Sequence, residues 1–323
     1  MEVISAHVRR LVLDQPRVVI GYDDSAVAVR ALGWAVREAH RLDAILEIVV
    51  AWRARHPAAD HYGSQTEYAR TAAFGREALR LAHRIDPQVN ARLTHHRGSA
   101  GRLLVRRSHG ALMVVLGTHS HLGIVGALIG STARYVTRHS TVPVSLVGPD
   151  SAVETEQRIV VTATDSQIAP SVLSWAVERA NQSATARMHI IDTVETWTTW
   201  TTPSLVDEPA RQLRARQAEE WHADLVAVIR GLAPLADITT ELLEGRPDVV
   251  AARLTAEDLV VLGIHDRHQR FELWTAPCPV VLVPERHSAS LTTRHADRPA
   301  PRATQVIPAE TPITTASRNG RKT

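Results

Sequence analysis

The residues best suited to chemistry lie in the stretch 114–132, where a strand, a glycine-rich loop and a helix follow one another. A Val- and Leu-rich run predicts a buried parallel strand, and Ser131 and Thr132 stand at the predicted helix start. Glycine lets a backbone approach a ligand, and a helix start offers unpaired N–H donors and a partial positive charge. The sequence therefore predicts a phosphate site at the amino end of this helix.

Two better-known phosphate loops do not fit this stretch. The Walker pattern needs a lysine before its Ser or Thr, but Gly130 stands there, and the chain's one lysine is Lys322. The dinucleotide pattern G-x-G-x-x-G is absent from the turn after the first predicted strand, 17–21. An alternative is that the loop glycines only allow close helix packing.

A second polar position, Asp23, follows that first strand. A carboxylate there can accept hydrogen bonds from ribose hydroxyls, whereas it would repel phosphate, so we expect it at the nucleoside end of a ligand. The alternative is structural, because Asp23 to Ser25 also form an ordinary turn in which Ser25 caps the following helix.

Composition narrows the class of protein. The chain of 323 residues has 44% hydrophobic and 22% charged residues, which suits two soluble domains. One cysteine and the lack of a secretory or membrane-spanning apolar run lead us to expect a cytoplasmic location and no membrane role. Residues 286–323 hold seven basic and two acidic residues, a net +5, which leaves −2 for the rest. We predict a disordered basic tail and no nucleic-acid role for the folded body.

The strand pattern occurs twice, which indicates an internal repeat. The stretch 17–25 returns as 158–166, and the tripeptide Trp-Ala-Val at 34–36 returns at 175–177 with the same offset. Strands alternate with helices in both copies, which predicts doubly wound parallel sheets. We predict a leader, two tandem domains and the tail, with these bounds: 1–15, 16–150, 151–285 and 286–323.

The two copies differ at the predicted site. The interval from Gly117 to Pro143 is ten residues longer than the interval from Gly263 to Pro279, and the difference removes the glycine loop. Thr164 stands at the position of Asp23. We therefore expect one ligand site, in the first domain.

The spacing Gly117, Ser120, Gly130-Ser131 resembles the ATP-binding signature Gly-x2-Gly-x9-Gly-Ser/Thr of the universal stress protein family, except that Ser120 replaces the second glycine. With the repeat, the chain resembles a tandem universal stress protein over roughly residues 16–285. The resemblance implies two Rossmann-like α/β domains, each with a five-stranded parallel sheet of strand order 3-2-1-4-5. It also implies that the domains pair through their fifth strands, 143–147 and 279–283.

The resemblance further implies ATP as cofactor, with or without Mg²⁺. Carried over residue by residue, the implied ATP-binding positions are Gly21, Asp23, Ala51, Leu116, Gly117, Ser120, Gly130, Ser131 and Thr132. We assign no catalytic and no metal-ligating residue.

On this basis we expect a stress-response regulator that acts through its nucleotide state and is not an enzyme, although slow ATP hydrolysis stays open. Its partners would be an unidentified protein and, within the chain, its own second domain, with a homodimer also open. The alternative function is a scaffold of the same fold that has lost nucleotide binding through Ser120.

Overall fold

A computed structural model describes residues 15–52, 61–118, 130–152, 157–194, 208–244, 248–264 and 276–285. We call residues 15–152 the N-terminal half and residues 157–285 the C-terminal half. The predicted tail and all of the predicted leader except Gln15 lie outside the described residues, as does Ser120. The predicted domain bounds stay predictions.

The N-terminal half alternates strands and helices as predicted. Its elements are β1 (Arg17–Gly21), α2 (Ala26–Arg41), β2 (Ile45–Trp52), α3 (His61–Ile85), β3 (Ala91–Arg97), α4 (Ala100–Ser108), β4 (Met113–Gly117), α5 (Ser131–His139) and β5 (Val144–Val147). The first and fifth strands begin within one residue of their predicted starts, 17 and 143, because each is an apolar run bounded by turn residues.

The C-terminal half repeats this order in its described residues. Its elements are β6 (Arg158–Thr164), α6 (Pro170–Asn181), β7 (Arg187–Val194), α7 (Glu208–Leu232), β8 (Asp237–Glu244), α8 (Asp248–Ala251), β9 (Asp258–Gly263) and β10 (Val280–Val283). The segment between β9 and β10, residues 265–275, is not described.

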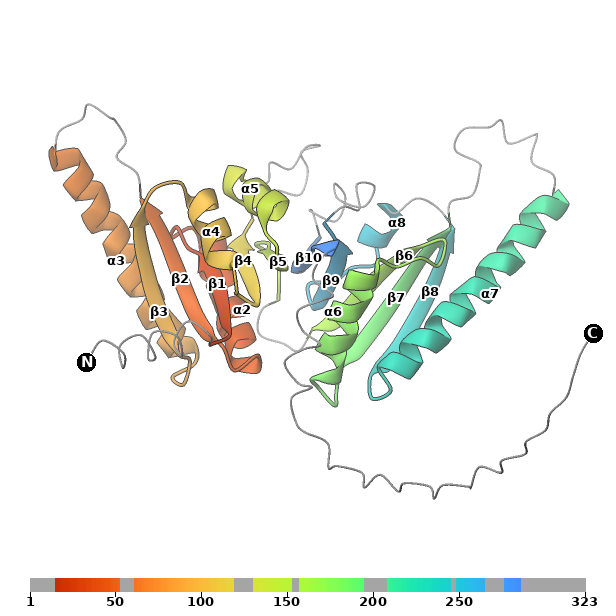
Figure 1. Ribbon diagram of the computed structural model, residues 1–323. Coiled ribbons are helices and arrows are strands. Elements are labelled where there is room, and N and C mark those ends of the chain that lie inside the picture. The colour runs from red at the N-terminus through yellow and green to blue at the C-terminus, as the bar shows by residue number, and fades with distance from the viewer. Residues whose placement is uncertain are drawn as a thin grey trace, which may run out of the picture. The chain divides into compact units, whose positions relative to one another are not determined.

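All ten strands form one sheet with the order β3-β2-β1-β4-β5-β10-β9-β6-β7-β8 (Figure 1). Each half therefore has the strand order 3-2-1-4-5, and its strands pair in parallel. The halves join where β5 and β10 pair antiparallel, with Ser145 opposite Val281. The fold class and the pairing through the fifth strands are confirmed. This pairing covers two strand edges that would otherwise be open.

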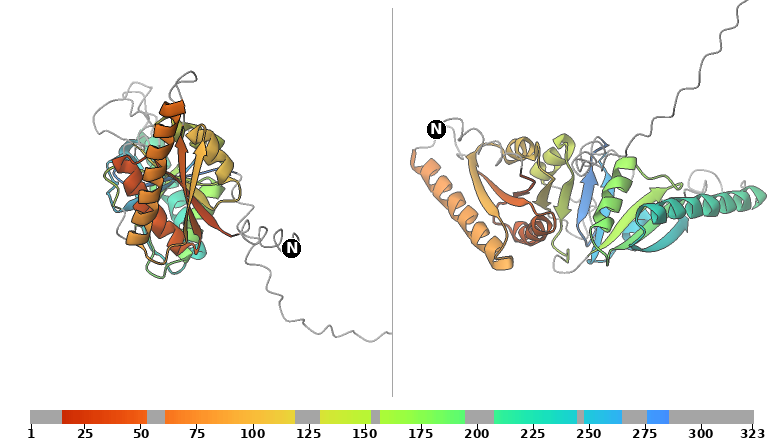
Figure 2. Two further views of the ribbon diagram at one scale, coloured as in Figure 1. Left: turned by 90° about the vertical axis from the view of Figure 1, so that its left-hand side faces the viewer. Right: turned by 60° about the horizontal axis from the view of Figure 1, so that its bottom comes forward.

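Helices cover both faces of the sheet, which explains the continuous apolar strands (Figure 2). In β1, Val18 and Ile20 belong to the core under α2 and α3, whereas Val19 belongs to the core under α4 and α5. None of the described helices is both long and apolar enough to span a membrane. The chain leaves β1 through α2 on one face and enters β4 from α4 on the other. The carboxyl ends of β1 and β4 are therefore the place where ligands bind in such sheets.

Candidate functional site

At the carboxyl end of β1, Gly21 is a glycine for a packing reason. A Cβ atom at Gly21 would lie 2.8 Å from Cδ2 of Leu116 and 2.9 Å from Cδ1 of Leu104. The next residue, Tyr22, is buried and donates its backbone N–H to the Val49 carbonyl at 3.0 Å, which extends the pairing of β1 with β2. Gly21 therefore brings the ends of β1 and β4 and helix α4 close together.

Asp23 is exposed and forms the turn that starts α2. Its Oδ1 accepts hydrogen bonds from the Ser25 hydroxyl at 2.7 Å and the Ser25 N–H at 3.1 Å. Ser25 in turn caps α2, because its Oγ accepts a hydrogen bond from the Ala28 N–H at 3.2 Å. The capping geometry is thus present, and within the described part of the chain Oδ2 of Asp23 accepts no hydrogen bond.

Beside Asp23, Asp24 adopts a left-handed backbone with φ of 67°. Its carboxylate accepts a hydrogen bond from the Tyr22 hydroxyl at 3.2 Å. Burial of Tyr22 and, after it, the charge of Asp24 raise the pKa of this phenol to about 12. The phenol therefore stays protonated at neutral pH and fixes the turn from inside.

At the carboxyl end of β4, Gly117 lies directly against the start of α2. A Cβ atom at Gly117 would lie 2.7 Å from the backbone C of Val27 and 2.9 Å from the backbone N of Ala28. Because the obstacle is backbone, it cannot move aside as a side chain does. The preceding residue, Leu116, is buried. Gly117 therefore allows β4 to approach the helix that Asp23 and Ser25 start.

Gly130 differs from these two glycines. It is exposed, its φ of −52° is open to any residue, and it is the N-cap of α5 without a side-chain capping bond. A Cβ atom there would meet nothing within 4 Å among the described residues. Ser131 is exposed and Thr132 is half-buried in the first helical turn. The first N–H groups of a helix have no acceptor within the helix, so they can donate hydrogen bonds to an anion at this helix start.

At the end of β2, Ala51 and Trp52 are half-buried, and Trp52 belongs to a group of rings that sequence reasoning missed. Trp52 packs edge-on against Tyr68 of α3 with centroids 5.5 Å apart, and the Arg97 guanidinium lies 5.5 Å from its centroid. The ring centroids of His95 and Tyr68 lie 4.8 Å apart, and Nε2 of His95 is hydrogen-bonded to Oγ1 of Thr71 at 2.8 Å. Burial and the charge of Arg76 lower the pKa of His95. The period-two spacing of His95 and Arg97 on one strand face was the available signal.

The C-terminal half has a polar network at the corresponding strand ends. Asp192 of β7, fully buried, accepts hydrogen bonds from the Ser166 hydroxyl at 2.6 Å and the Ser166 N–H at 3.0 Å. Nδ1 of His222 in α7 lies 3.2 Å from Oδ2 of the same carboxylate. Asp165 and Ser166 are left-handed, with φ of 49° and 57°. Sequence reasoning missed this network, although a carboxylate inside an apolar strand was its signal.

Comparison with known proteins agrees with this architecture. The universal stress protein family matches residues 16–148, from just before β1 to just after β5. The likeness to universal stress proteins at the level of this family match therefore covers the N-terminal half. Universal stress protein Rv2624c of Mycobacterium tuberculosis is 28% identical over 165 residues, 50% of this chain. The matched region spans 60% of the length of that relative.

Solved structures extend the likeness to both halves. A universal stress protein from Archaeoglobus fulgidus is 14% identical and covers 84% of this chain and 97% of its own, with a TM-score of 0.61. A match of that length includes both halves, so the chain has a tandem fold. A universal stress protein solved in complex with cAMP is 24% identical and covers 42% of this chain and 97% of its own, with a TM-score of 0.35.

Proposed function

We propose that the N-terminal half binds ATP at the carboxyl ends of β1 and β4, and that the chain regulates a stress response through its nucleotide state. The observation that carries this proposal is Gly130. Packing explains the glycines at Gly21 and Gly117, but neither backbone angle nor described neighbours require one at Gly130. A phosphate held by the N–H groups of the α5 start would make a glycine necessary there, because a side chain would intrude on it.

Asp23 fits the nucleoside end of the same ligand. One of its oxygens is engaged by Ser25, and the other is open to a ribose hydroxyl. We propose binding rather than rapid turnover, because the Asp23 and Ser25 side chains at this turn are already hydrogen-bonded to each other and to the helix start. Slow hydrolysis stays open. No residue is assigned to Mg²⁺, which would reach the site with the triphosphate.

Calorimetry of the full chain with ATP tests the proposal, with one site per chain expected. Gly130→Val should abolish binding while the thermal unfolding midpoint stays unchanged. Gly231→Val is the matched control, since a Cβ at Gly231 in α7 likewise meets nothing within 4 Å among the described residues. Equal ATP affinity in a folded Gly130→Val chain would disprove the phosphate assignment.

The scaffold alternative is favoured by one observation, the complete helix cap that Asp23 and Ser25 form with each other and with the Ala28 N–H. In that case the N-terminal half would bind no nucleotide, and the Asp23 carboxylate would serve α2 alone. The same titration separates the two functions, because a scaffold gives no heat of binding with ATP at any concentration that leaves the chain folded.

A further inference from the structure

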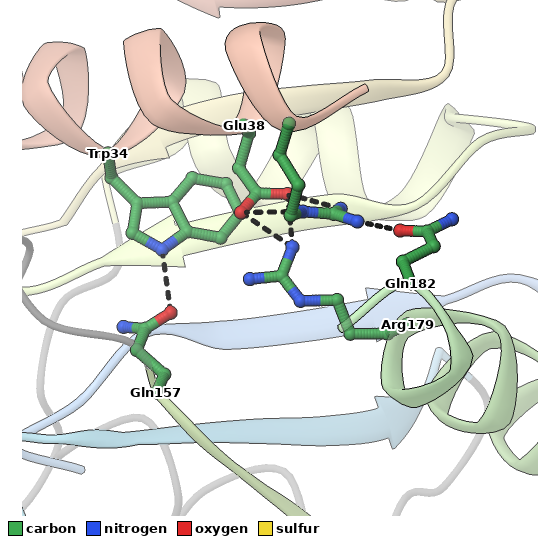
Figure 3. Close-up of polar contacts among 6 residues, drawn as sticks. Trp34, Glu38, Gln157, Arg179 and Gln182 are labelled. Atoms are coloured by element: carbon green, nitrogen blue, oxygen red, sulfur yellow. Dashed lines mark hydrogen bonds and ion pairs between the residues drawn. The ribbon is translucent and has the colours of Figure 1, made fainter. Parts of the chain in front are cut away.

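The two halves meet through residues that occupy equivalent positions in the repeat. Glu38 of α2 and Arg179 of α6 are 141 residues apart, the offset that relates Arg17 to Arg158, and they touch (Figure 3). Arg41 and Gln182 have the same separation and are hydrogen-bonded. A contact between equivalent positions means that these pairs lie beside the pseudo-twofold axis that relates the halves.

Equivalent positions at this axis carry unlike charges. Glu38 is 3% exposed, and its two oxygens lie 2.6 and 2.5 Å from Nη1 of Arg179. Arg41 of the same helix reaches the carboxylate at 2.7 Å. Burial acts to raise the pKa of Glu38, but the charges of Arg179 and Arg41 outweigh it and hold this pKa below its usual value. The buried carboxylate is thus ionised and needs the other half's arginine.

The same interface between identical halves would place like charges together. A twofold operation sets each residue at the axis against its own copy. Two N-terminal halves would bring Glu38 against Glu38, and two C-terminal halves would bring Arg179 against Arg179. Each Glu38 would keep Arg41 of its own helix, but it would lose Arg179 and lie against a second buried carboxylate. Buried like charges are more unfavourable than exposed ones, because the interior screens them poorly. Either homotypic pair would therefore be weaker than the pair within one chain.

A second contact has the same asymmetry. The Trp34 indole N–H donates to Oε1 of Gln157 at 3.0 Å in a buried position (Figure 3). At the repeat offset, the position of Gln157 is occupied in the N-terminal half by Pro16, which has no side-chain acceptor. Two paired N-terminal halves would leave the Trp34 N–H buried without a partner, which is unfavourable.

One position, Ser145, favours the pairing of two N-terminal halves. Ser145 faces Val281 at the β5–β10 junction, and its buried Oγ has no hydrogen-bond partner among the described residues. Two N-terminal halves would bring two such hydroxyls together, where they could bond each other. A single neutral hydrogen bond would stabilise such a pair less than two buried like charges would destabilise it. The charges at the axis therefore determine which halves pair.

We propose that the unlike charges of Glu38 and Arg179 make this face selective. Each half then pairs with a half that carries the opposite charge at this position, and not with its own copy. The partner that fits the β5, α2 face of this protein is therefore its own C-terminal half. The edge of β5 is covered by β10 of the same chain. The short connection between the halves also favours this pairing, because it gives them a high effective concentration.

Charge exchange in the full chain tests the selectivity. Glu38→Arg and Arg179→Glu should each lower the urea midpoint of unfolding, and the chain with both changes should recover most of the loss, because it restores two arginines around one carboxylate. Arg102→Glu, a reversal on an exposed residue of α4, is the control and should shift the midpoint little. A double variant as unstable as the two losses combined would overturn the proposal, as would unchanged single variants.

Mixing the two single variants gives an independent readout, including when either fails to fold alone. Co-expressed Glu38→Arg and Arg179→Glu chains can satisfy both charges only by exchanging halves. We expect a 1:1 species of twice the chain mass in sedimentation and native mass spectrometry, at least tenfold more abundant than in either variant alone. Two separate monomers, or no rescue of folding in the mixture, would overturn the proposal.

Discussion

The two halves share a strand order, but the residues at the carboxyl ends of their first, second and fourth strands have different contacts and burial. In the N-terminal half, Asp23 is exposed and Gly117 lies against helix backbone. In the C-terminal half, a buried carboxylate, Asp192, holds the turn after β6. At Gly263, the equivalent of Gly117, a Cβ atom would lie 3.7 Å from its nearest neighbour among the described residues, which is an ordinary contact.

The difference teaches that a sheet can keep its core while its ligand edge changes. The central strands of both halves, among them β1, β6 and β9, remain buried apolar runs, because the joint sheet needs both. The polar residues at the strand ends are free of that requirement. In the N-terminal half Asp23 is exposed, and in the C-terminal half Asp192 is buried in an internal hydrogen-bond network. Six substitutions, grouped in four predictions, test this contrast and the junction of the halves.

The largest expected effect is on the C-terminal network. Asp192→Ala should lower the free energy of unfolding by about 2–4 kcal/mol, because it removes a buried acceptor from Ser166 and His222. ATP affinity should not change. Asp237→Ala, an exposed aspartate at the start of β8, is the control and should stay within about 0.5 kcal/mol. Urea unfolding and calorimetry measure both. A marked loss of ATP binding in the Asp192 variant would indicate that ATP binds to the C-terminal half and would contradict the proposed site.

The two glycines after the fourth strands form a matched pair. Gly117→Ala should destabilise the chain by about 1–3 kcal/mol, because its Cβ would overlap the backbone of Val27. Gly263→Ala should be nearly neutral, since its Cβ has ordinary contacts with Val172 and Ala169. Thermal unfolding of both variants checks the comparison, and equal midpoints would mean that the ends of β4 and β9 are packed alike.

Asp23 and Thr164 form the second matched pair. Asp23→Ala should weaken ATP binding by about 1–3 kcal/mol, because a hydrogen bond from ribose to a charged acceptor is lost. Its helix-cap role predicts a further loss of stability of about 1 kcal/mol. Thr164→Ala should leave ATP affinity unchanged. Calorimetry and unfolding separate the two effects, and a loss of stability alone would return Asp23 to a purely structural role.

The smallest expected effect is at the junction of the halves. Ser145→Val gives β5 the residue that β10 has at the equivalent position and removes a buried hydroxyl that has no partner in the described structure. We expect a gain of stability of about 1 kcal/mol in urea unfolding. A loss instead would mean that the Ser145 hydroxyl is satisfied in solution.

Local sequence patterns determined most of the fold. Apolar runs bounded by turns predicted the strands, Ser25 predicted the cap of α2, and the repeat predicted two domains of one topology. These features could be predicted because strand burial and helix capping depend on residues near one another in the chain. The candidate N-terminal site follows from the same kind of pattern, a strand end and a helix start, and it stays a prediction.

Only the tertiary structure decided which residues meet. Glycine patterns alone did not separate Gly117, which backbone neighbours require, from Gly130, which no described neighbour requires. The sequence likewise contained Glu38 and Arg179 at the repeat offset, but not their contact. That contact depends on where β5 and β10 pair, because their register places the axis between the halves and so sets which equivalent side chains face each other.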